Sequence, residues 1–96
     1  MKDGIKIIGG KYKGRVILVP ETRLRPTISL VKEAVFDIIG DKISGSSVLD
    51  LFAGSGNYGI EALSRGAYLA DFVDSNKKAC HIIRQNLLNI NEKGNV

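Results

Sequence analysis

Hydrophobic residues in the first part of the chain follow two spacings, one typical of strands and one typical of a helix. Short β-branched segments at 5–8 and 15–19 flank a glycine-containing connection, and this pattern predicts a β-hairpin. Further along, apolar residues recur every three or four positions, namely Val31, Ala34, Val35, Ile38 and Ile39. That spacing predicts a helix with one buried apolar stripe, capped by Thr27 or Ser29 and ending at Gly40.

From residue 47 onward the pattern alternates between strands and helices. Residues 47–52 are too continuously apolar for a half-exposed strand, so we expect a parallel strand covered on both faces. A glycine-rich turn, a short helix, a second parallel strand and a longer helix are expected at 53–57, 58–65, 69–73 and 77–91. The predicted fold class is α/β, with an N-terminal β-hairpin and helix followed by a β-α-β-α unit. Open α/β sheets usually have about five or six strands, so this fold is incomplete.

Composition restricts the class of protein. The chain has 96 residues, 44% of them hydrophobic and 25% charged, which is ordinary for one globular domain. The single cysteine, Cys80, cannot form an internal disulfide, and its neighbour His81 points about 100° away on a helix, so the two cannot share a metal ion. No apolar run approaches the ~18 residues that cross a bilayer, and no signal peptide is visible. We expect a soluble cytoplasmic protein without a metal site or a membrane partner.

The glycine-rich turn carries the most specific chemistry in the sequence. Residues 54–59 match G-x-G-x-x-G, and the match follows a predicted strand and opens a predicted helix. Glycines there allow a sharp bend close to a ligand, and the helix N-terminus offers unpaired N–H donors. Asp74 ends the next strand, 20 residues after Gly54, where a carboxylate accepts hydrogen bonds from ribose hydroxyls. These features predict a nucleoside-cofactor site formed by Ala53, Gly54, Ser55, Gly56 and Asp74.

Asp50 indicates which cofactor the turn accepts. It lies four residues before Gly54, at the carboxyl end of the first parallel strand. A carboxylate beside the turn would repel a pyrophosphate, and this disfavours NAD or FAD as the cofactor. A carboxylate suits the ammonium and sulfonium groups of S-adenosylmethionine (SAM), so Asp50 joins the predicted site. The alternative role for Asp50 is to cap the helix or brace the loop.

Positive charge is concentrated in the first third of the chain. Residues 1–32 contain eight basic and two acidic residues, a net charge of +6, whereas the remainder carries a net charge of −2. Such a concentration is typical of a surface that binds phosphates, although it also fits a merely solvated face. Six of these eight bases lie in the hairpin connection, the second strand, the following connector and the next helix; they are Lys11, Lys13, Arg15, Arg23, Arg25 and Lys32. We expect them to line one side of the cofactor crevice.

Three residues in this basic region have two possible roles each. Tyr12, between Lys11 and Lys13, either stacks on a base or packs on its own sheet. Arg25 and Thr27 either bind phosphates or serve as a tether and a helix cap.

The sequence around the glycine turn resembles a known family. The segments VLDLFAGSG at 48–56 and GIEALSRGA at 59–67 closely resemble the first motif of the RsmD family, which consists of bacterial 16S rRNA guanine-N2 methyltransferases. Upstream segments are similar to the family's hairpin, Arg-Pro-Thr segment and first helix; they are GKYKGR at 10–15, LRPT at 24–27 and VKEAVF at 31–36. Phe72-Val73-Asp74 resembles its second motif. Asn57-Tyr58 replaces the small apolar pair usual in the family, which makes the mouth of the turn more polar.

The resemblance implies a class I (Rossmann-like) SAM-dependent methyltransferase that modifies the exocyclic N2 of a guanine in 16S rRNA. It implies a basic hairpin and RNA-facing connector over 1–27, and the first half of the SAM-binding domain over 28–96. The RNA-binding residues it implies are Lys11, Tyr12, Lys13, Arg15, Arg23, Arg25 and Thr27. The family's acceptor motif, Asn/Asp-Pro-Pro-Tyr/Phe, is absent because Pro20 and Pro26 are the only prolines. No catalytic residue is therefore expected in this chain.

Alternative functions and partners follow from the same features. One alternative is a SAM-dependent methyltransferase that modifies another nucleic acid or a protein. The other is a truncated, non-catalytic RNA-binding or vestigial protein. The expected partner is 16S rRNA or a small-subunit assembly intermediate. Unpaired sheet edges also recruit other chains, so self-association is expected.

Overall fold

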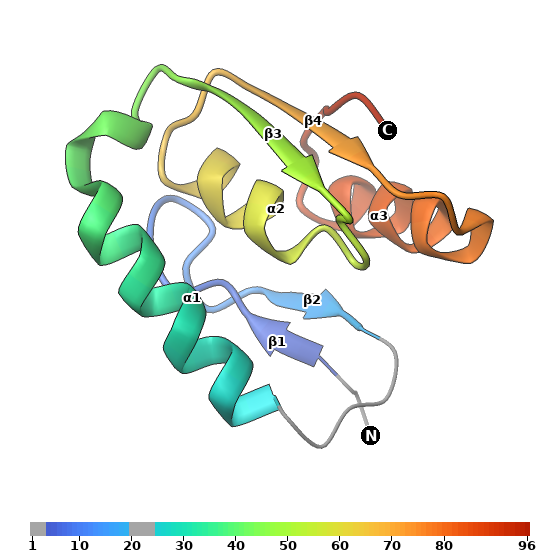
Figure 1. Ribbon diagram of the computed structural model, residues 1–96, viewed down its shortest axis with the longest axis horizontal. Coiled ribbons are helices and arrows are strands. Elements are labelled where there is room, and N and C mark those ends of the chain that lie inside the picture. The colour runs from blue at the N-terminus through green and yellow to red at the C-terminus, as the bar shows by residue number, and fades with distance from the viewer. Residues whose placement is uncertain (1–3, 20–24) are drawn as a thin grey trace.

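The computed structural model describes residues 4–19 and 25–96, and only the backbone of residues 25–27. The elements follow the predicted order (Figure 1). They are β1 (Gly4–Lys6), β2 (Val16–Leu18), α1 (Arg25–Ile39), the 3-10 helix η1 (Gly40–Ile43), β3 (Ser47–Leu51), α2 (Asn57–Ser64), β4 (Leu69–Val73) and α3 (Lys77–Asn89). Within the described ranges, no helix has the length and apolarity needed to cross a bilayer.

The strands form two separate sheets. β1 and β2 pair antiparallel as the predicted hairpin, with Ile5 opposite Ile17. β3 and β4 pair in parallel, with Asp50 opposite Phe72, so their carboxyl ends meet at one edge. The C-terminal segment covers part of the other edge of β4, because the Asn95 N–H donates to the carbonyl of Ala70 at 3.0 Å. This pairing leaves less free edge than the sequence suggested, and no described contact supports the expected self-association.

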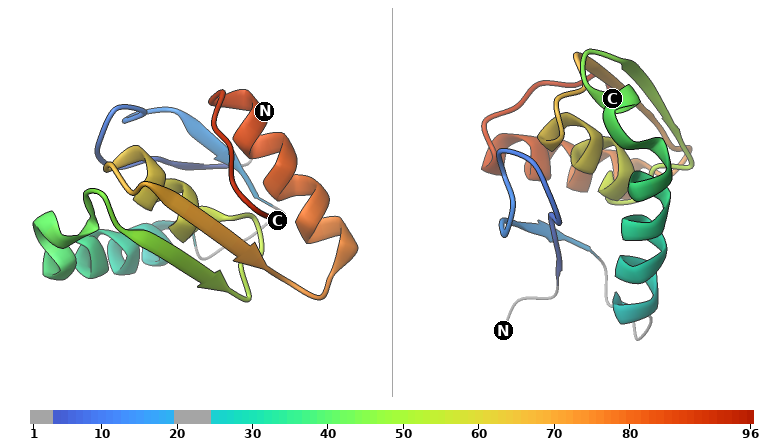
Figure 2. Two further views of the ribbon diagram at one scale, coloured as in Figure 1. Left: turned by 90° about the horizontal axis from the view of Figure 1, so that it is seen from above. Right: turned by 90° about the vertical axis from the view of Figure 1, so that its left-hand side faces the viewer.

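All three helices and the hairpin lie on the same side of the β3–β4 sheet (Figure 2). One hydrophobic cluster joins the hairpin to α2, α3 and the sheet, with Ile7 and Ile17 packed together with Ile60, Phe72 and Ile83. A second cluster joins α1 to α2 through Phe36 and Ala62. The hairpin is therefore part of the α/β unit, and the alternation of strand and helix produces the expected partial Rossmann-like fold. The sequence analysis placed a boundary after Thr27, between the RNA-facing segment and the SAM-binding domain. In the structure this position lies inside α1, so no structural boundary occurs there.

The opposite face of the sheet is open, contrary to the prediction for residues 47–52. Leu49 and Leu51 on β3 are 59% and 57% exposed, and Val73 on β4 is also exposed. Their side chains alternate with Val48 and Asp50, which are partly buried against the helices. Covering both faces needs elements beyond the three helices, all of which pack on one side.

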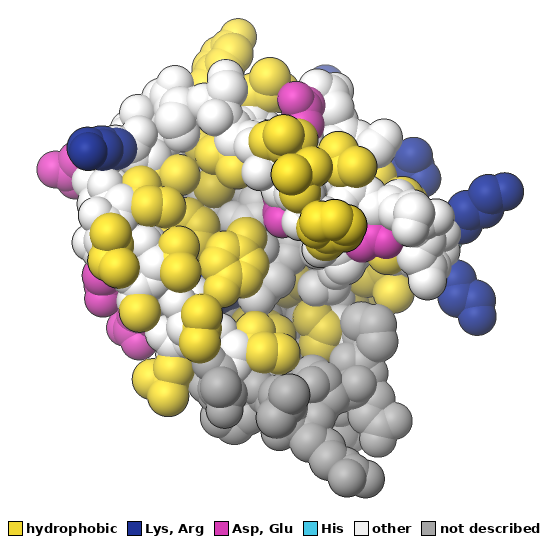
Figure 3. All heavy atoms as spheres, viewed as in Figure 1, with side chains coloured by type: hydrophobic (Ala, Val, Ile, Leu, Met, Phe, Trp, Pro, Cys, Tyr) yellow, Lys and Arg dark blue, Asp and Glu magenta, His cyan; other side chains and the backbone are white. Residues whose placement is uncertain are grey.

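The orientation of α1 also differs from the prediction. Val31 and Ile38 of the predicted apolar stripe are exposed, whereas Lys32 and Phe36 are buried. The inward face is the one that carries Lys32, because a buried carboxylate on α2 pairs with it. Hydrophobic side chains consequently gather on the surface over α1 and beside β3 (Figure 3).

The predicted C-terminal end of α1 is correct, but its predicted N-cap is wrong. The helix begins at Arg25, so neither Thr27 nor Ser29 is its N-cap. It ends at Ile39, and Gly40 follows with a φ of +59°, a backbone conformation that glycine adopts without strain. The predicted stop at Gly40 is confirmed.

Candidate cofactor site at the glycine turn

The glycine turn joins the end of β3 to the start of α2. Gly54 and Gly56 have φ values of +59° and +83°, which favour glycine at both positions. The Gly56 N–H closes the turn by donating to the Ala53 carbonyl at 2.8 Å. A Cβ added at Gly54 would have no neighbour within 4 Å, so the backbone is open to a ligand there.

The third glycine of the motif has a packing role. A Cβ on Gly59 would lie 2.3 Å from the ring of Phe72, a distance that side chains do not tolerate. Glycine at this position lets α2 approach β4 closely, as in other turns of this pattern. Within the motif, Gly59 is therefore required for helix–strand packing, whereas Gly54 is accessible to a ligand.

Asp74 extends from the end of β4 and accepts hydrogen bonds from two backbone N–H groups. Its Oδ1 accepts from Asn76 and its Oδ2 from Gly54, both at 2.9 Å. These bonds, the one from Asn76 first, hold the pKa of Asp74 below its usual value. The side chain is partly exposed, so the ionised carboxylate remains accessible from solvent.

Asp50 lies on the other side of the turn, at the end of β3. Its Oδ2 accepts a hydrogen bond from the Gly59 N–H at 2.9 Å, so Asp50 does brace the start of α2. Burial raises the pKa of Asp50, and the nearby negative charge of Asp74 adds to the rise. A cation beside Asp50 would offset that effect by stabilising the charged carboxylate.

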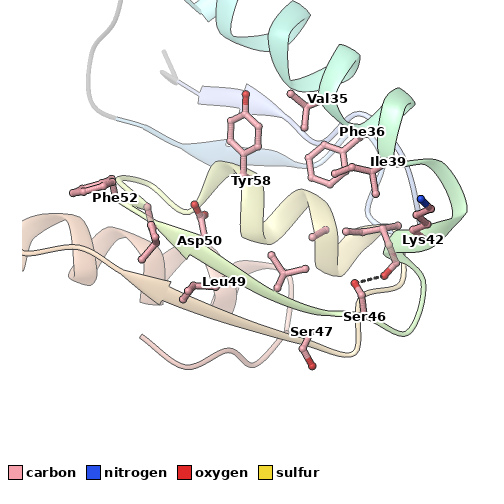
Figure 4. A pocket seen from close by; sticks show the side chains of 15 residues that line it. Val35, Phe36, Ile39, Lys42, Ser46, Ser47, Leu49, Asp50, Phe52 and Tyr58 are labelled. Atoms are coloured by element: carbon pink, nitrogen blue, oxygen red, sulfur yellow. Dashed lines mark hydrogen bonds between the residues drawn. The ribbon is translucent and has the colours of Figure 1, made fainter.

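A groove runs between α1 and β3, and Asp50 lies at one end of it (Figure 4). Its volume is about 660 Å³, and Tyr58, Val35 and Phe36 contribute to its lining. A second cavity of about 550 Å³ lies on the other side of the turn, where Gly54 and Ser55 face the first turn of α3. The turn thus separates two cavities, with Ala53 on the Asp50 side.

Sequence reasoning missed Phe52 as a feature of this site. Phe52 is 92% exposed and has a φ of +55°, an unusual backbone conformation for a bulky residue. It lies at the rim of the groove, directly before the glycine turn (Figure 4). In the sequence, Phe52 only ends an apolar strand, and an aromatic residue in that position normally lies in the core. Its exposure was therefore not predicted.

The tip of the hairpin lies far from the glycine turn. The Lys11 N–H donates to the Ser64 carbonyl at 2.9 Å, and Ser64 is the last residue of α2. The glycine turn precedes the first residue of α2, about 12 Å away along a helix of eight residues. The expectation that the bases line the cofactor crevice is therefore wrong for the hairpin tip, and also for Lys32, which is fully buried.

The aromatic and basic side chains of the hairpin contact the end of α3 and the segment after it. The Tyr12 hydroxyl donates to Glu92 at 2.6 Å and its ring packs against the core, so Tyr12 adopts the packing role. Burial and then the bond to Glu92 raise the pKa of Tyr12. Lys11 forms an ion pair with Glu92 at 3.3 Å, and the Arg15 guanidinium donates to the Asn89 carbonyl. Lys13 is exposed.

The remaining residues of the predicted RNA surface cannot be placed. Arg23 lies outside the described residues, as do the side chains of Arg25 and Thr27. Cys80 is partly buried and His81 is exposed.

Comparison with known proteins identifies relatives of the chain. The family model described as "Conserved hypothetical protein 95" matches residues 5–96. The Bacillus subtilis protein named "Putative rRNA methyltransferase YlbH" is 48% identical over 84 residues, which cover 86% of this chain and 46% of that protein. "Ribosomal RNA small subunit methyltransferase D" of Escherichia coli K12 is 40% identical over 84 residues, covering 86% of this chain and 42% of that protein.

A solved structure is similar along almost the whole chain. The Escherichia coli protein described as "Putative methyltransferase yhhF" superposes with a TM-score of 0.83 and 33% identity, covering 97% of this chain and 52% of that one. The chain therefore spans about half the length of the relatives that it matches.

Proposed function

Because the chain belongs to the Conserved hypothetical protein 95 family, the RsmD family, we propose that it is the cofactor-binding half of a SAM-dependent rRNA methyltransferase. The complete protein transfers a methyl group to the exocyclic N2 of a guanine in 16S rRNA. Relatives named as rRNA methyltransferases support this proposal, and they are about twice as long as the chain. We assign the reaction to the complete protein, and to this chain the task of holding the cofactor.

One observation carries the proposal: two carboxylates flank a turn whose backbone is open. Asp74 is ionised and braced by two N–H groups, which suits it to accept hydrogen bonds from the ribose hydroxyls of SAM. Asp50 is partly buried on the opposite side of Gly54, where a carboxylate attracts the ammonium and sulfonium groups. A diphosphate in the same place would meet negative charge from both sides.

The residues present fit SAM in shape as well as in charge. Gly54 leaves room for the ligand against the backbone, because a side chain there would project into open space. Phe52 offers an exposed aromatic face at the rim of the groove. SAM supplies the transferable methyl group, and these residues bind and orient it.

We further propose that the hairpin contacts the phosphates of rRNA, or of a small-subunit assembly intermediate, through Lys11, Lys13 and Arg15. Lys13 is the strongest candidate because it is exposed and its ammonium has no ion pair among the interactions of the described residues. Lys11 and Arg15 are held by contacts near the end of α3, and these contacts fix the positions of the two positive charges. Tyr12 shapes the tip by packing rather than by stacking on a base.

Calorimetry with SAM, its demethylated product and NAD tests the cofactor proposal. We expect the protein to prefer the first two, and Asp74→Ala to weaken SAM binding about tenfold or more by removing charge-assisted hydrogen bonds. Asp37→Ala, which removes an exposed carboxylate from α1, is the matched control and should leave the affinity unchanged. Equal or tighter binding of NAD would overturn the proposal.

A further inference from the structure

We propose that Lys32 is a positioning residue for the cofactor turn, acting through Asn57 at the start of α2 and Glu61 one turn further along that helix. This inference rests on the proposed function, because the turn is where SAM would bind. No feature of the sequence indicated it, since Lys32 was expected to lie on the basic surface.

The ammonium group of Lys32 is fully buried and all three of its donors are used. It donates to Asn57 Oδ1 at 2.7 Å and to the Lys6 carbonyl at 3.2 Å, and it pairs with Glu61 Oε1 at 2.9 Å. These three acceptors belong to α2 and β1, whereas Lys32 belongs to α1. One cation therefore fixes the relative positions of three elements.

The Glu61 carboxylate extends these contacts to the hairpin. It accepts hydrogen bonds from the Ile8 N–H at 3.0 Å, the Gly9 N–H at 2.9 Å and Arg65 Nε at 2.8 Å. Among the described residues, no buried side-chain nitrogen or oxygen atom lacks a hydrogen-bond partner. The network is thus complete, with backbone donors from the hairpin on one side and Lys32 on the other.

Asn57 connects this network to the turn. It is the first residue of α2 and directly follows Gly56, so the position of its side chain restricts where the turn ends and α2 begins. Gly54, two residues before Gly56, is in turn bonded to Asp74. A shift of Asn57 would move Gly54 relative to the carboxylate that is proposed to hold the ribose.

Stabilisation alone is a weak explanation for such a network. Replacing a buried ion pair with apolar residues of similar size is often neutral or stabilising, because both charges lose their hydration when buried. What directional hydrogen bonds add is a defined geometry. The observed geometry sets the start of α2, which is the part of the helix next to the proposed ligand.

Two substitutions in the complete protein separate positioning from stability. Asn57→Ala removes the link to the turn and keeps the Lys32–Glu61 pair, so the variant should fold. We expect SAM affinity to fall about tenfold, and Asn57→Asp, which keeps the acceptor oxygen, to restore affinity to within about threefold of the parent. Gln85→Ala, which removes an exposed side-chain amide from α3, is the matched control and should not change the affinity.

A double-mutant cycle tests whether Asn57 acts through Lys32. If it does, Asn57→Ala combined with Lys32→Met should lose no more affinity than the more severe single variant. Unchanged affinity in folded Asn57→Ala, or additive losses in the cycle, would overturn the inference. A parent protein that fails to bind SAM would instead contradict the proposed function, so the two failures are distinguishable.

Discussion

Glu61 on α2 differs from the two carboxylates at the glycine turn, Asp50 and Asp74, in how completely protein donors satisfy it. Glu61 is fully buried, and its hydrogen bonds come from the hairpin, Lys32 and Arg65. Asp50 and Asp74 accept backbone N–H groups at the edge of the sheet and remain within reach of solvent. The comparison shows why charge alone does not identify a site. A carboxylate surrounded by protein donors holds the fold together, whereas one that is braced but accessible is available to a ligand.

The largest effect should come from removing the buried partner of Lys32. Glu61→Leu leaves an ammonium group buried without a counter-ion, and we expect a loss of about 3–5 kcal/mol in the free energy of unfolding, measured by urea denaturation. Combining it with Lys32→Met should recover most of the loss. A single variant that loses less than about 1 kcal/mol would contradict the comparison.

Glu61 and Asp50 should respond to pH with opposite signs, because the pKa of Glu61 is lowered and that of Asp50 is raised. Burial alone would raise the pKa of Glu61, but the hydrogen bonds from Ile8, Arg65 and Lys32 bring it below its usual value. The stability that Glu61 contributes is therefore present at neutral pH and lost as the pH falls through the lowered pKa. Asp50 has a raised pKa, so its contribution is greatest below the ordinary aspartate pKa of about 3.9 and is lost as the pH rises through the value in the folded protein.

Asp50→Asn tests this difference at one position. The amide keeps an acceptor for the Gly59 N–H and removes the buried charge, so the variant should be more stable than the parent at pH 7. The gain should be smaller than the loss caused by Glu61→Leu and should disappear near pH 4. The same substitution should weaken SAM binding, measured by calorimetry at pH 7. A variant that is less stable than the parent at pH 7 would show that the Asp50 charge is not unfavourable there.

The smallest effect concerns the accessible cations rather than the carboxylates. Lys13→Ser in the complete protein should reduce the salt dependence of rRNA binding by about 0.7–0.9 log units of affinity per log unit of salt, the value for one phosphate contact. SAM affinity should stay the same because the hairpin tip is at the far end of α2. Lys42→Ser is the matched control, since Lys42 is exposed but lies in η1. If rRNA affinity depends on salt identically in Lys13→Ser and the parent, Lys13 does not contact a phosphate and is only solvated.

The sequence predicted features that depend on nearby residues. The glycine turn, the strands on either side of it and the stop at Gly40 all follow from local backbone preferences, and all were found. The place of Asp74 beside Gly54 followed from the geometry of parallel strands, which brings their carboxyl ends together.

Features that depend on distant partners were not predicted. The face of α1 that turns inward is set by a contact between Lys32 and Glu61, which are far apart in sequence, and apolar spacing carries no information about that pair. The hairpin tip was misplaced for the same reason, because its position depends on contacts with Ser64 and Glu92. Phe52 was overlooked because its exposure depends on the open face of the sheet.

The placement of the hairpin tip and the glycine turn at opposite ends of α2 has an evolutionary consequence. The backbone of the hairpin is anchored by Ser64 and Glu61, whereas the side chain of Lys13 is exposed to solvent. If the tip contacts nucleic acid and the turn binds SAM, as proposed, residues at the tip can diverge without altering the residues around Gly54. Substrate choice and cofactor use could then change independently within this small unit, as happens when one fold supports many functions.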